Sequence, residues 1–179
     1  MSYCNDENKE EYRNGNEIGE CIIEIDHIKY SFTHYHFFKK EGKYKIKYLF
    51  KNTITNCNKI FYDCSSLESL DFSNFDTKNV KYMMSMFENC TSLTNINLTN
   101  FNTENVINMN SMFFGCCSLT KIDLSNFNTK KVNDMGCLFF GCSKLIDLDL
   151  TNIDTQNVQW MNYMFNRCSS LKSLNFIKF

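Results

Sequence analysis

The chain has no proline, six glycines, one tryptophan and three histidines among its 179 residues. These shortages exclude several classes of protein. Without proline there are no proline-rich linkers, so turns depend on asparagine, serine, aspartate and glycine. No stretch approaches the ~20 apolar residues of a transmembrane helix, and no glycine-rich phosphate loop occurs. The N-terminal residues also lack the apolar run of a secretion signal, which favours a cytoplasmic location.

The few histidines argue against catalysis and metal binding. His27, His34 and His36 all precede the repeats described below, so no cysteine or serine of the repeats has a histidine base near it in sequence. Cys21 precedes these histidines, but neither a C-x-x-C pair nor a helical H-x-x-x-H spacing is present. We therefore expect a protein that is not an enzyme and that uses no metal and no cofactor.

A block of constant length recurs five times from Phe61 onward, with the same residue types at the same offsets. Such a fixed period is typical of repeat proteins whose units stack on one another. Its apolar columns predict a continuous core. Two of these columns are the phenylalanines Phe61, Phe87, Phe113, Phe139 and Phe165 and the cysteines Cys64, Cys90, Cys116, Cys142 and Cys168.

Each block contains two periodicities. In SLESLDFSNF, from Ser66 to Phe75, Leu70 and Phe72 alternate with polar residues, which predicts a short strand with a polar outer face. In TKNVKYMMSMFENC, residues 77–90, the apolar residues step by three and four, which predicts an amphipathic helix. The Thr77 hydroxyl is expected to cap that helix. The sequence thus predicts an α/β fold with one strand and one helix in each 26-residue repeat.

The pattern C-x-x-L-x-x-L-x-L-S-x-F-x-T-x-x-V-x-x-M-x-x-M-F-x-x-C resembles the BspA-type leucine-rich repeat. It is carried by stretches such as CTSLTNINLTNFNTENVINMNSMFFGC, from Cys90 to Cys116, and the resemblance covers residues 57–179. It implies a right-handed leucine-rich-repeat solenoid without catalytic activity, used as a surface or interaction module. Phe75 and its equivalents stand where an ordinary leucine-rich repeat has asparagine or cysteine.

Charge is distributed unevenly although the formal net charge is −1. Residues 1–26 hold eight acids and two bases, residues 27–62 hold one acid and eight bases, and the rest hold eleven acids and nine bases. We interpret residues 1–20 as an acidic, disordered tail because they contain few apolar residues. Residues 21–56 are assigned to an N-terminal β cap, and residues 57–179 to five repeats, the last of them incomplete.

The segment before the repeats is expected to cover the core edge of the first one. Lys43 to Lys51 (KYKIKYLFK) alternates lysines with apolar residues, which predicts a strand with a basic outer face. Residues 28–32 alternate as well, and Glu41 and Gly42 offer a turn, so we expect a β-hairpin cap. The lysines are interpreted as protection of an exposed strand, and binding of an anionic partner is the alternative.

At the other end the sequence stops at Phe179, on a core column and with no polar residue after it. This predicts an uncapped C-terminal edge of the stack. Edges of this kind associate or fray. Self-association through this edge is one expectation, and a repeat cut short is the other.

The ten cysteines raise the question of thiol chemistry. The five column cysteines are expected to be buried as small apolar groups. A disulfide staple is the alternative, but parallel Cβ directions in neighbouring repeats suit disulfide geometry poorly. Cys137 lies outside the column and is a candidate surface thiol. A thiol-based redox or metal-binding protein remains a minor alternative.

Two faces of the predicted stack carry candidate partner-binding residues. Trp160 and Tyr163 are three apart on one predicted helix, so they are expected to face outward together as an aromatic anchor. Residue types change from repeat to repeat on this helix face, as in a binding surface; partial burial of the aromatics is the alternative. The strand-face candidates, which alternatively only solvate the sheet, are Asp71, Asn97, Asp123 and Asp149. The helix-face candidates are Tyr82, Trp160, Tyr163, Phe114 and Phe140.

We therefore predict a non-catalytic protein–protein interaction module or scaffold that binds a protein partner through the solenoid surface. A cell-surface adhesin or antigen of BspA type is the alternative that the resemblance implies. No nucleic-acid partner and no transmembrane segment are expected. The identity of the partner does not follow from the repeat pattern, because a fold does not specify a function.

Overall fold

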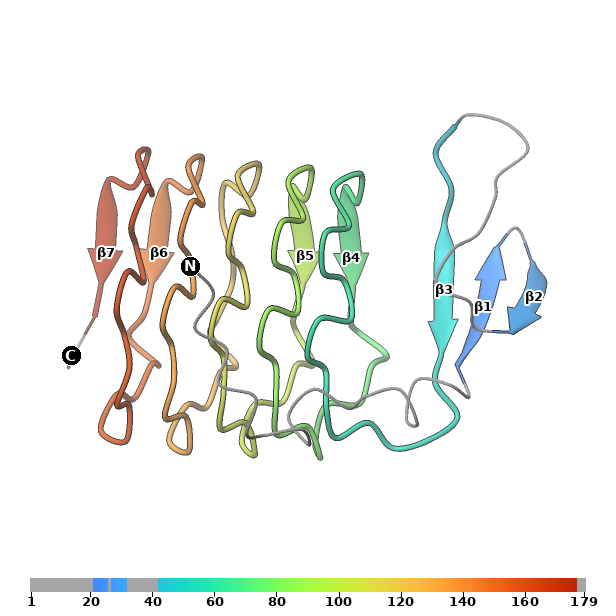
Figure 1. Ribbon diagram of the computed structural model, residues 1–179, viewed down its shortest axis with the longest axis horizontal. Coiled ribbons are helices and arrows are strands. Elements are labelled where there is room, and N and C mark those ends of the chain that lie inside the picture. The colour runs from blue at the N-terminus through green and yellow to red at the C-terminus, as the bar shows by residue number, and fades with distance from the viewer. Residues whose placement is uncertain (1–20, 26, 32–41, 177–179) are drawn as a thin grey trace, which may run out of the picture.

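A computed structural model describes residues 21–25, 27–31 and 42–176. It consists of a small N-terminal sheet and a stack of coils that follow one another along the long axis of the molecule (Figure 1). The predicted acidic tail, residues 1–20, lies outside the described residues. The described residues form seven strands and no helix: β1 (Ile22–Ile25), β2 (Ile28–Ser31), β3 (Ile46–Leu49), β4 (Ser69–Asp71), β5 (Asn95–Asn97), β6 (Asp147–Asp149) and β7 (Ser173–Asn175).

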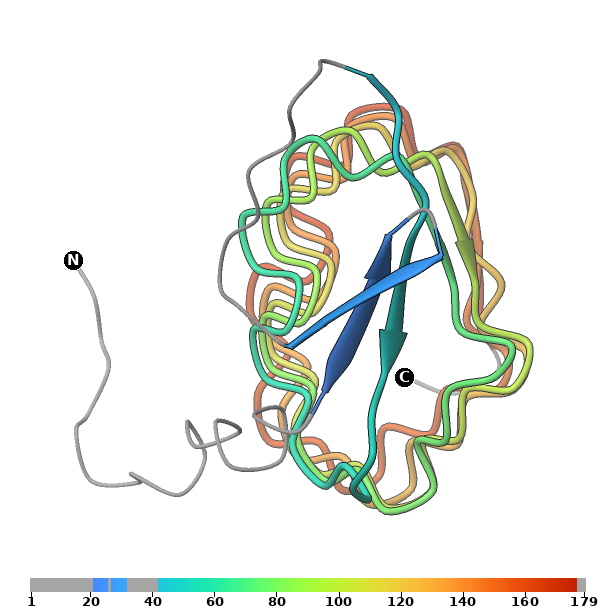
Figure 2. The same cartoon turned by 90° about the vertical axis from the view of Figure 1, so that its right-hand side faces the viewer.

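Each coil corresponds to one repeat of the sequence and lies directly against the next coil. Parallel bridges join equivalent positions of neighbouring coils, so we number the coils 1 to 5 from Asn56, Tyr82, Asn108, Asp134 and Trp160. Seen along the stack, the coils superimpose (Figure 2). β4 pairs with β5 and β6 with β7, in parallel and in the same register. Residues 121–123 of coil 3 form no strand, so these two-stranded sheets are separate.

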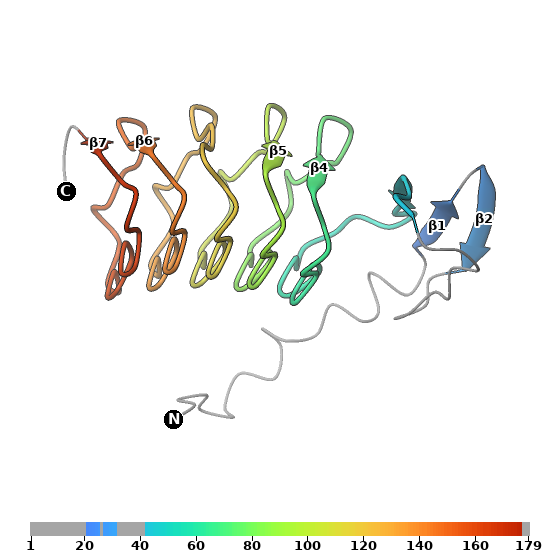
Figure 3. The same ribbon diagram turned by 90° about the horizontal axis from the view of Figure 1, so that it is seen from above.

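The predicted helix in each repeat is wrong, and so is the leucine-rich-repeat solenoid that was built on it. The opening part of each coil instead forms a strand-like segment with two tight turns, which we call a rung. In Figure 3 the rungs lie opposite the strands, on the far side of each coil. The five rungs are residues 56–63, 82–89, 108–115, 134–141 and 160–167.

Hydrogen bonding shows why no helix forms. In a helix, every backbone N–H bonds to the carbonyl four residues earlier. In a rung, every second N–H donates to the next coil, and the residues between them close tight turns such as Met86 N–H to Met83 O at 3.3 Å. For coil 2 the inter-coil bonds are Met83 N to Asn108 O (3.0 Å), Ser85 N to Asn110 O (2.9 Å), Phe87 N to Met112 O (2.9 Å) and Asn89 N to Phe114 O (2.7 Å).

The turns of each rung place two residues in the left-handed backbone region, which is incompatible with a continuous helix. In coil 2 these are Ser85 (φ 54°) and Asn89 (φ 60°), and the equivalents of Asn89 in coils 3 and 4 are Gly115 (φ 70°) and Gly141 (φ 74°). Glycine and asparagine adopt this conformation most readily. Asparagine and glycine in the column of Asn89 therefore indicate a turn at this position. This indication is stronger than that of the three-and-four apolar spacing, which predicted a helix.

The apolar columns nevertheless face the core, as predicted. Met83, Met86, Phe87 and Cys90 of coil 2 are fully buried. The phenylalanine column forms a continuous ring stack, in which Phe113 and Phe139 lie 5.5 Å apart and nearly parallel. Side chains facing the interior of one coil thus pack on the equivalent side chains of the next coil, and the core runs the length of the stack.

Thr77, expected to cap a helix, instead joins two coils. Its hydroxyl donates to the carbonyl of Asn102 at 2.9 Å and accepts from the N–H of the same residue at 2.7 Å. Thr103 and Thr129 make the same pair of bonds to the coil that follows each of them. All three threonines are buried, so each of these repeats contributes one polar clamp beside its apolar core.

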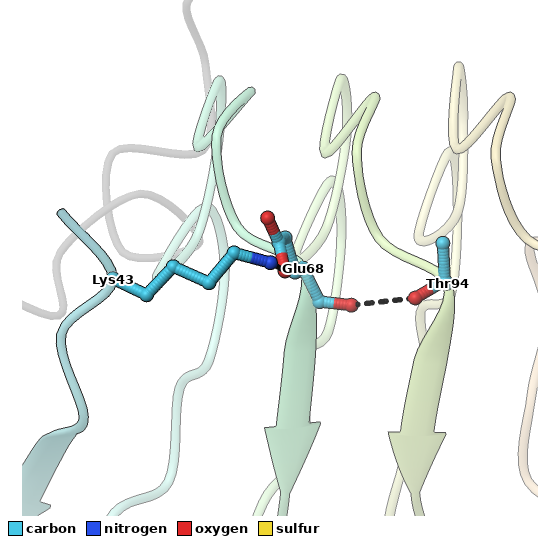
Figure 4. Close-up of polar contacts among 3 residues, drawn as sticks. All are labelled: Lys43, Glu68 and Thr94. Atoms are coloured by element: carbon cyan, nitrogen blue, oxygen red, sulfur yellow. Dashed lines mark hydrogen bonds and ion pairs between the residues drawn. The ribbon is translucent and has the colours of Figure 1, made fainter.

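The N-terminal sheet covers the first coil. Its strand order is β2-β1-β3 and both pairings are antiparallel. The ring of Tyr48, in β3, lies 5.6 Å from that of Phe61, and Phe50 lies 5.1 Å from Phe75. Lys43 reaches coil 1 on the outside and forms an ion pair with Glu68 at 2.6 Å (Figure 4). The Glu68 carbonyl in turn accepts the Thr94 hydroxyl of coil 2 at 3.1 Å.

The predicted hairpin is wrong in its pairing. It was expected to join residues 28–32 to Lys43–Lys51, but β1 lies between those segments and pairs with both. The reason is the pair Ile23 and Ile25, which bury one face of β1 and make it the central strand. Phe32 and the expected turn residue Glu41 lie outside the described residues.

Candidate interaction surface

The polar column on the strand face closes a local turn in each of coils 1 to 4. The side-chain oxygen of Asp71 accepts the backbone N–H of Ser73 at 2.9 Å. The side-chain oxygens of Asn97, Asp123 and Asp149 likewise accept the backbone N–H of the residue two positions later. Asn97 also donates its amide to Asp71 at 2.9 Å. These four candidates therefore have a structural role, since a turn of this kind favours asparagine or aspartate.

The aspartates of this column are held in the ionised form. The Ser73 N–H and hydroxyl lower the pKa of Asp71, the Ser125 hydroxyl and N–H lower the pKa of Asp123, and Thr151 lowers the pKa of Asp149 in the same way. A hydrogen bond to the charged form of a carboxylate favours that form. The strand face thus presents three ionised carboxylates, with the neutral amide of Asn97 between the first two.

On the opposite side, two of the predicted aromatic candidates form a pair. The rings of Phe114 and Phe140 stack at 4.6 Å with an angle of 4° between their planes. The guanidinium of Arg167 lies 5.4 Å from the Phe140 ring centre, a distance at which the cation and the ring attract. Phe114 and Phe140 are half-buried. The structure thus joins residues of coils 3, 4 and 5 into one aromatic and cationic cluster.

Trp160 and Tyr163 lie in the rung of coil 5 and are among the most exposed large side chains, at 53% and 63%. Their predicted common helix face does not exist, because Trp160 forms a parallel bridge with Asp134 and Tyr163 sits at a left-handed turn residue with φ 58°. Tyr82, the fifth candidate, is half-buried between Asn56 and Asn108. Tyr82 is thus three coils away from Trp160.

The repeats themselves show that the aromatic side chains of coil 5 are not required by the fold. At the position of Trp160, Asn56, Asn108 and Asp134 each accept the N–H two residues later, at 2.8–2.9 Å. The indole of tryptophan has no acceptor for this bond. The position of Tyr163 holds lysine, serine, serine and cysteine in the other coils, and a left-handed conformation is costly for a bulky residue.

Of the five column cysteines that were predicted to be buried, three are buried, namely Cys90, Cys116 and Cys142. Cys90 donates to the carbonyl of Phe61 at 3.1 Å, and Cys116 and Cys142 bond likewise to Phe87 and Phe113. Burial raises the pKa of Cys90 to about 12 and raises the pKa of Cys116 further still. Cys64 and Cys168 are half-buried, and all nine cysteines in the described residues are free thiols.

Cys137, the candidate surface thiol, is half-buried. Burial, followed by the charges of Asp134 and Glu88, raises its pKa. A reactive cysteine needs the opposite environment, one that stabilises the thiolate. The geometry of this residue thus disfavours nucleophilic chemistry.

Within the described residues, no group of three or more histidine, cysteine, aspartate or glutamate side chains is placed to hold a metal ion. His34 and His36 lie outside these residues, and so does Phe179. The described part of the chain also contains no helix that is long and apolar enough to cross a membrane.

Residues 32–176 match the family described as "Mycoplasma protein of unknown function, DUF285". The chain belongs to this family. The match spans more than half of the sequence and includes all five coils, and it replaces the resemblance to the BspA-type leucine-rich repeat, which was wrong. No curated protein and no solved structure matches the chain.

One residue of this surface was missed from the sequence. Arg167 belongs to the column of Asp63, Asn89, Gly115 and Gly141, where the left-handed turn favours small or amide side chains. An arginine in this column departs from the pattern in the same way as Trp160 and Tyr163 do. All three departures fall within the rung of coil 5. A comparison of equivalent positions in the five repeats would therefore have identified Arg167 from the sequence.

Proposed function

We propose that the chain is a non-catalytic protein-interaction module that binds a protein partner through the rung side of coils 3 to 5. The observation that carries this proposal is the position of Trp160, Tyr163 and Arg167 within one rung, at positions where the other coils hold small or polar side chains in most cases. Tryptophan, tyrosine and arginine are the residues that contribute most often to the binding energy of protein interfaces.

The neighbouring Phe114–Phe140 pair supports the same face. These rings stack on each other across coils 3 and 4, and Arg167 of coil 5 lies over Phe140. Rigid aromatic side chains lose little conformational entropy when a partner binds. The strand face is the weaker candidate because its aspartates and asparagine repeat uniformly and already close local turns.

Binding of partners by the full chain and by its Trp160→Ala/Tyr163→Ala variant tests the proposal. Proteins cross-linked to each form in a lysate of the source cells are compared quantitatively. A specific partner should fall by about tenfold or more with the variant, since loss of a hot-spot residue costs ~2 kcal/mol. Tyr62→Ala removes an exposed aromatic residue of coil 1 and serves as the control. Equal capture by all three forms would show that the rung side of coil 5 does not bind the partner.

Two further predictions stay open. A role as a cell-surface adhesin is tested by labelling intact cells with a membrane-impermeant biotin reagent, with a cytosolic protein as control. Self-association through the C-terminal edge is tested by measuring the mass of the chain in solution across a range of concentrations. Phe179, from which that edge was inferred, lies outside the described residues.

A further inference from the structure

The strand side of the stack is interrupted between coils 2 and 3. Coils 1 and 2 are joined there by the β4–β5 pairing and by flanking backbone bonds, such as Phe72 N–H to Asn97 O at 3.0 Å. The equivalent bond between coils 2 and 3 would join Leu98 N–H to Asp123 O. It is absent, and no other backbone bond joins these two coils along the strand side of the described structure. Coil 3 therefore lies between β5 and β6 without a strand of its own (Figure 1).

The two coils are nevertheless held together on both sides of the interruption. Their rungs are bonded to each other, as described above. Beyond the strand segment, the amide of Asn126 donates to the carbonyl of Thr99 at 2.6 Å. The hydroxyl of Thr103 then forms its pair of bonds with the backbone of Asn128. The interruption is thus a local opening in a continuous stack.

A cleft lies at the corner of the coils that follows this opening. It has a volume of about 330 Å³, and six polar residues line it: Thr99, Asn100, Asn102 and Glu104 of coil 2 and Asn126 and Asn128 of coil 3. This volume is at the lower end of the range for small-molecule sites, about 300–1,000 Å³. Phe101 also borders the cleft but is only 1% exposed, so its ring belongs to the core. The polar lining indicates a polar ligand.

Each asparagine of the cleft uses one half of its amide group in the fold. Asn100 and Asn126 donate through Nδ2 to carbonyls of the preceding coil, at 2.7 and 2.6 Å. Asn102 and Asn128 accept through Oδ1 the backbone N–H two residues later, at 2.9 and 3.3 Å. The other halves, two carbonyl oxygens and two amino groups, have no partner among the described residues. These two acceptors and two donors are already fixed in place, which lowers the entropy cost of binding.

Glu104 adds a carboxylate that the neighbouring coils lack. The corresponding residues of coils 1, 3 and 4 are Lys78, Lys130 and Gln156. Glu104 is exposed and forms no ion pair within the described part of the chain. An ionised carboxylate has two oxygens that only accept hydrogen bonds, and it repels phosphate and other anions. The cleft between coils 2 and 3 therefore differs in charge from the same corner of the other coils.

We propose that this cleft binds an uncharged sugar unit. A hydroxyl group both donates and accepts hydrogen bonds, so the adjacent hydroxyls of a sugar ring match a lining that mixes donors with acceptors. The sugar hydroxyls donate to the carboxylate of Glu104 and to the side-chain carbonyls of Asn100 and Asn126. They accept from the amino groups of Asn102 and Asn128.

Other ligand classes match the lining less well. A lysine or arginine side chain has donors only, so it would leave both amino groups of the cleft without a partner. A phosphate or a carboxylate would face the charge of Glu104. The site lies in coils 2 and 3, away from the rung of coil 5, so it goes beyond the proposed function and does not depend on it.

Titration of the full chain with sugars, followed by NMR, tests the proposal. The probes are glucose, galactose, mannose and N-acetylglucosamine, and the signals are the side-chain amino groups of Asn102 and Asn128. At least one probe should shift both signals with a Kd on the order of 1 mM. Glucuronate should bind more weakly than glucose, because its carboxylate faces Glu104. If none of the four sugars shifts these signals at millimolar concentration, the proposal is overturned.

The repeats supply substitutions that the fold tolerates. Asn102→Asp keeps the oxygen that accepts the N–H two residues later, as Asp76 and Asp154 do at 2.9 and 3.0 Å, but it removes the amino group. Glu104→Lys introduces the residue of coils 1 and 3. Each variant should remain folded by circular dichroism and weaken sugar binding by about tenfold or more. Unchanged binding in both variants would overturn the proposal.

Matched controls lie at the same positions of coil 4. Asp154→Asn and Gln156→Lys change the same kinds of groups outside the cleft and should alter sugar binding by less than about twofold. A loss as large as that in the coil 2 variants would place the sugar elsewhere and overturn the proposal.

A trisaccharide of the tightest-binding sugar distinguishes two sources of the ligand. Binding that is tighter by about threefold or more supports a glycan chain, whereas equal binding supports a free sugar.

Discussion

Two substitutions of Ser85 distinguish the rung from a helix, because the two conformations predict opposite orders of stability for the two variants. Ser85 occupies the first left-handed position of the coil 2 rung, with φ 54°. Ser85→Gly and Ser85→Ala remove the same hydroxyl but differ in their backbone preferences. The comparison between the two variants therefore isolates the backbone conformation at this position.

The expected difference follows from two opposing contributions. A left-handed conformation costs a residue with a Cβ about 1–2 kcal/mol, and glycine escapes this cost. Glycine loses about 0.5–1 kcal/mol more conformational entropy on folding than alanine does. Ser85→Gly should thus be more stable than Ser85→Ala by about 0.5–1 kcal/mol. In a helix interior the order reverses, because alanine is favoured over glycine by about 1 kcal/mol.

Urea unfolding followed by far-ultraviolet circular dichroism measures the difference. With a slope of about 2 kcal/mol per M, the transition midpoint of Ser85→Gly should lie about 0.3–0.5 M above that of Ser85→Ala. Gly42→Ala is the control, since its added Cβ would meet Tyr44 at an ordinary 3.9 Å, and it should be neutral or slightly stabilising. A higher midpoint for Ser85→Ala than for Ser85→Gly would refute the rung conformation.

Three further outcomes are expected. Thr129→Val should destabilise the chain by about 2–4 kcal/mol in urea unfolding, because it removes both clamp bonds to Asp154 from a buried site, whereas Thr129→Ser, which keeps the hydroxyl, should lose less than half of that. Asp123→Ala should cost about 0.5–1 kcal/mol by loss of the turn bond, and Asp123→Asn should cost little because Asn97 makes the same bond natively; equal loss in both variants would exclude this role. As pH rises from 9 toward 12, the unfolded chain ionises its thiols near 9.0 while Cys90 keeps its proton up to about 12, so stability should fall by about 2–4 kcal/mol over this window. Thiolate absorbance at 240 nm measures the titration, and ionisation of every thiol near pH 9 in the folded chain would contradict burial.

The candidate site was predicted in part. Trp160 and Tyr163 stood out from their columns in the sequence, and the structure leaves both exposed. Phe114 and Phe140 were proposed separately and prove to be in contact. The role of Asp71 and its equivalents in closing turns was not anticipated, because a bond between a side chain and the backbone two residues away leaves no mark in a hydrophobic pattern.

The sequence alone determines the register of this protein and the inward side of each repeat. Its strict period aligns Phe61 with Phe87 and Cys64 with Cys90, and residues in such columns are buried in whatever conformation lets equal units stack. The conformation itself is decided only in the stack. An isolated segment 77–90 has the spacing of an amphipathic helix, but its alternate N–H groups find their acceptors in the next coil. Bonds to a neighbouring coil cannot be read from local spacing, and they outweigh it because they repeat along the whole length of the stack.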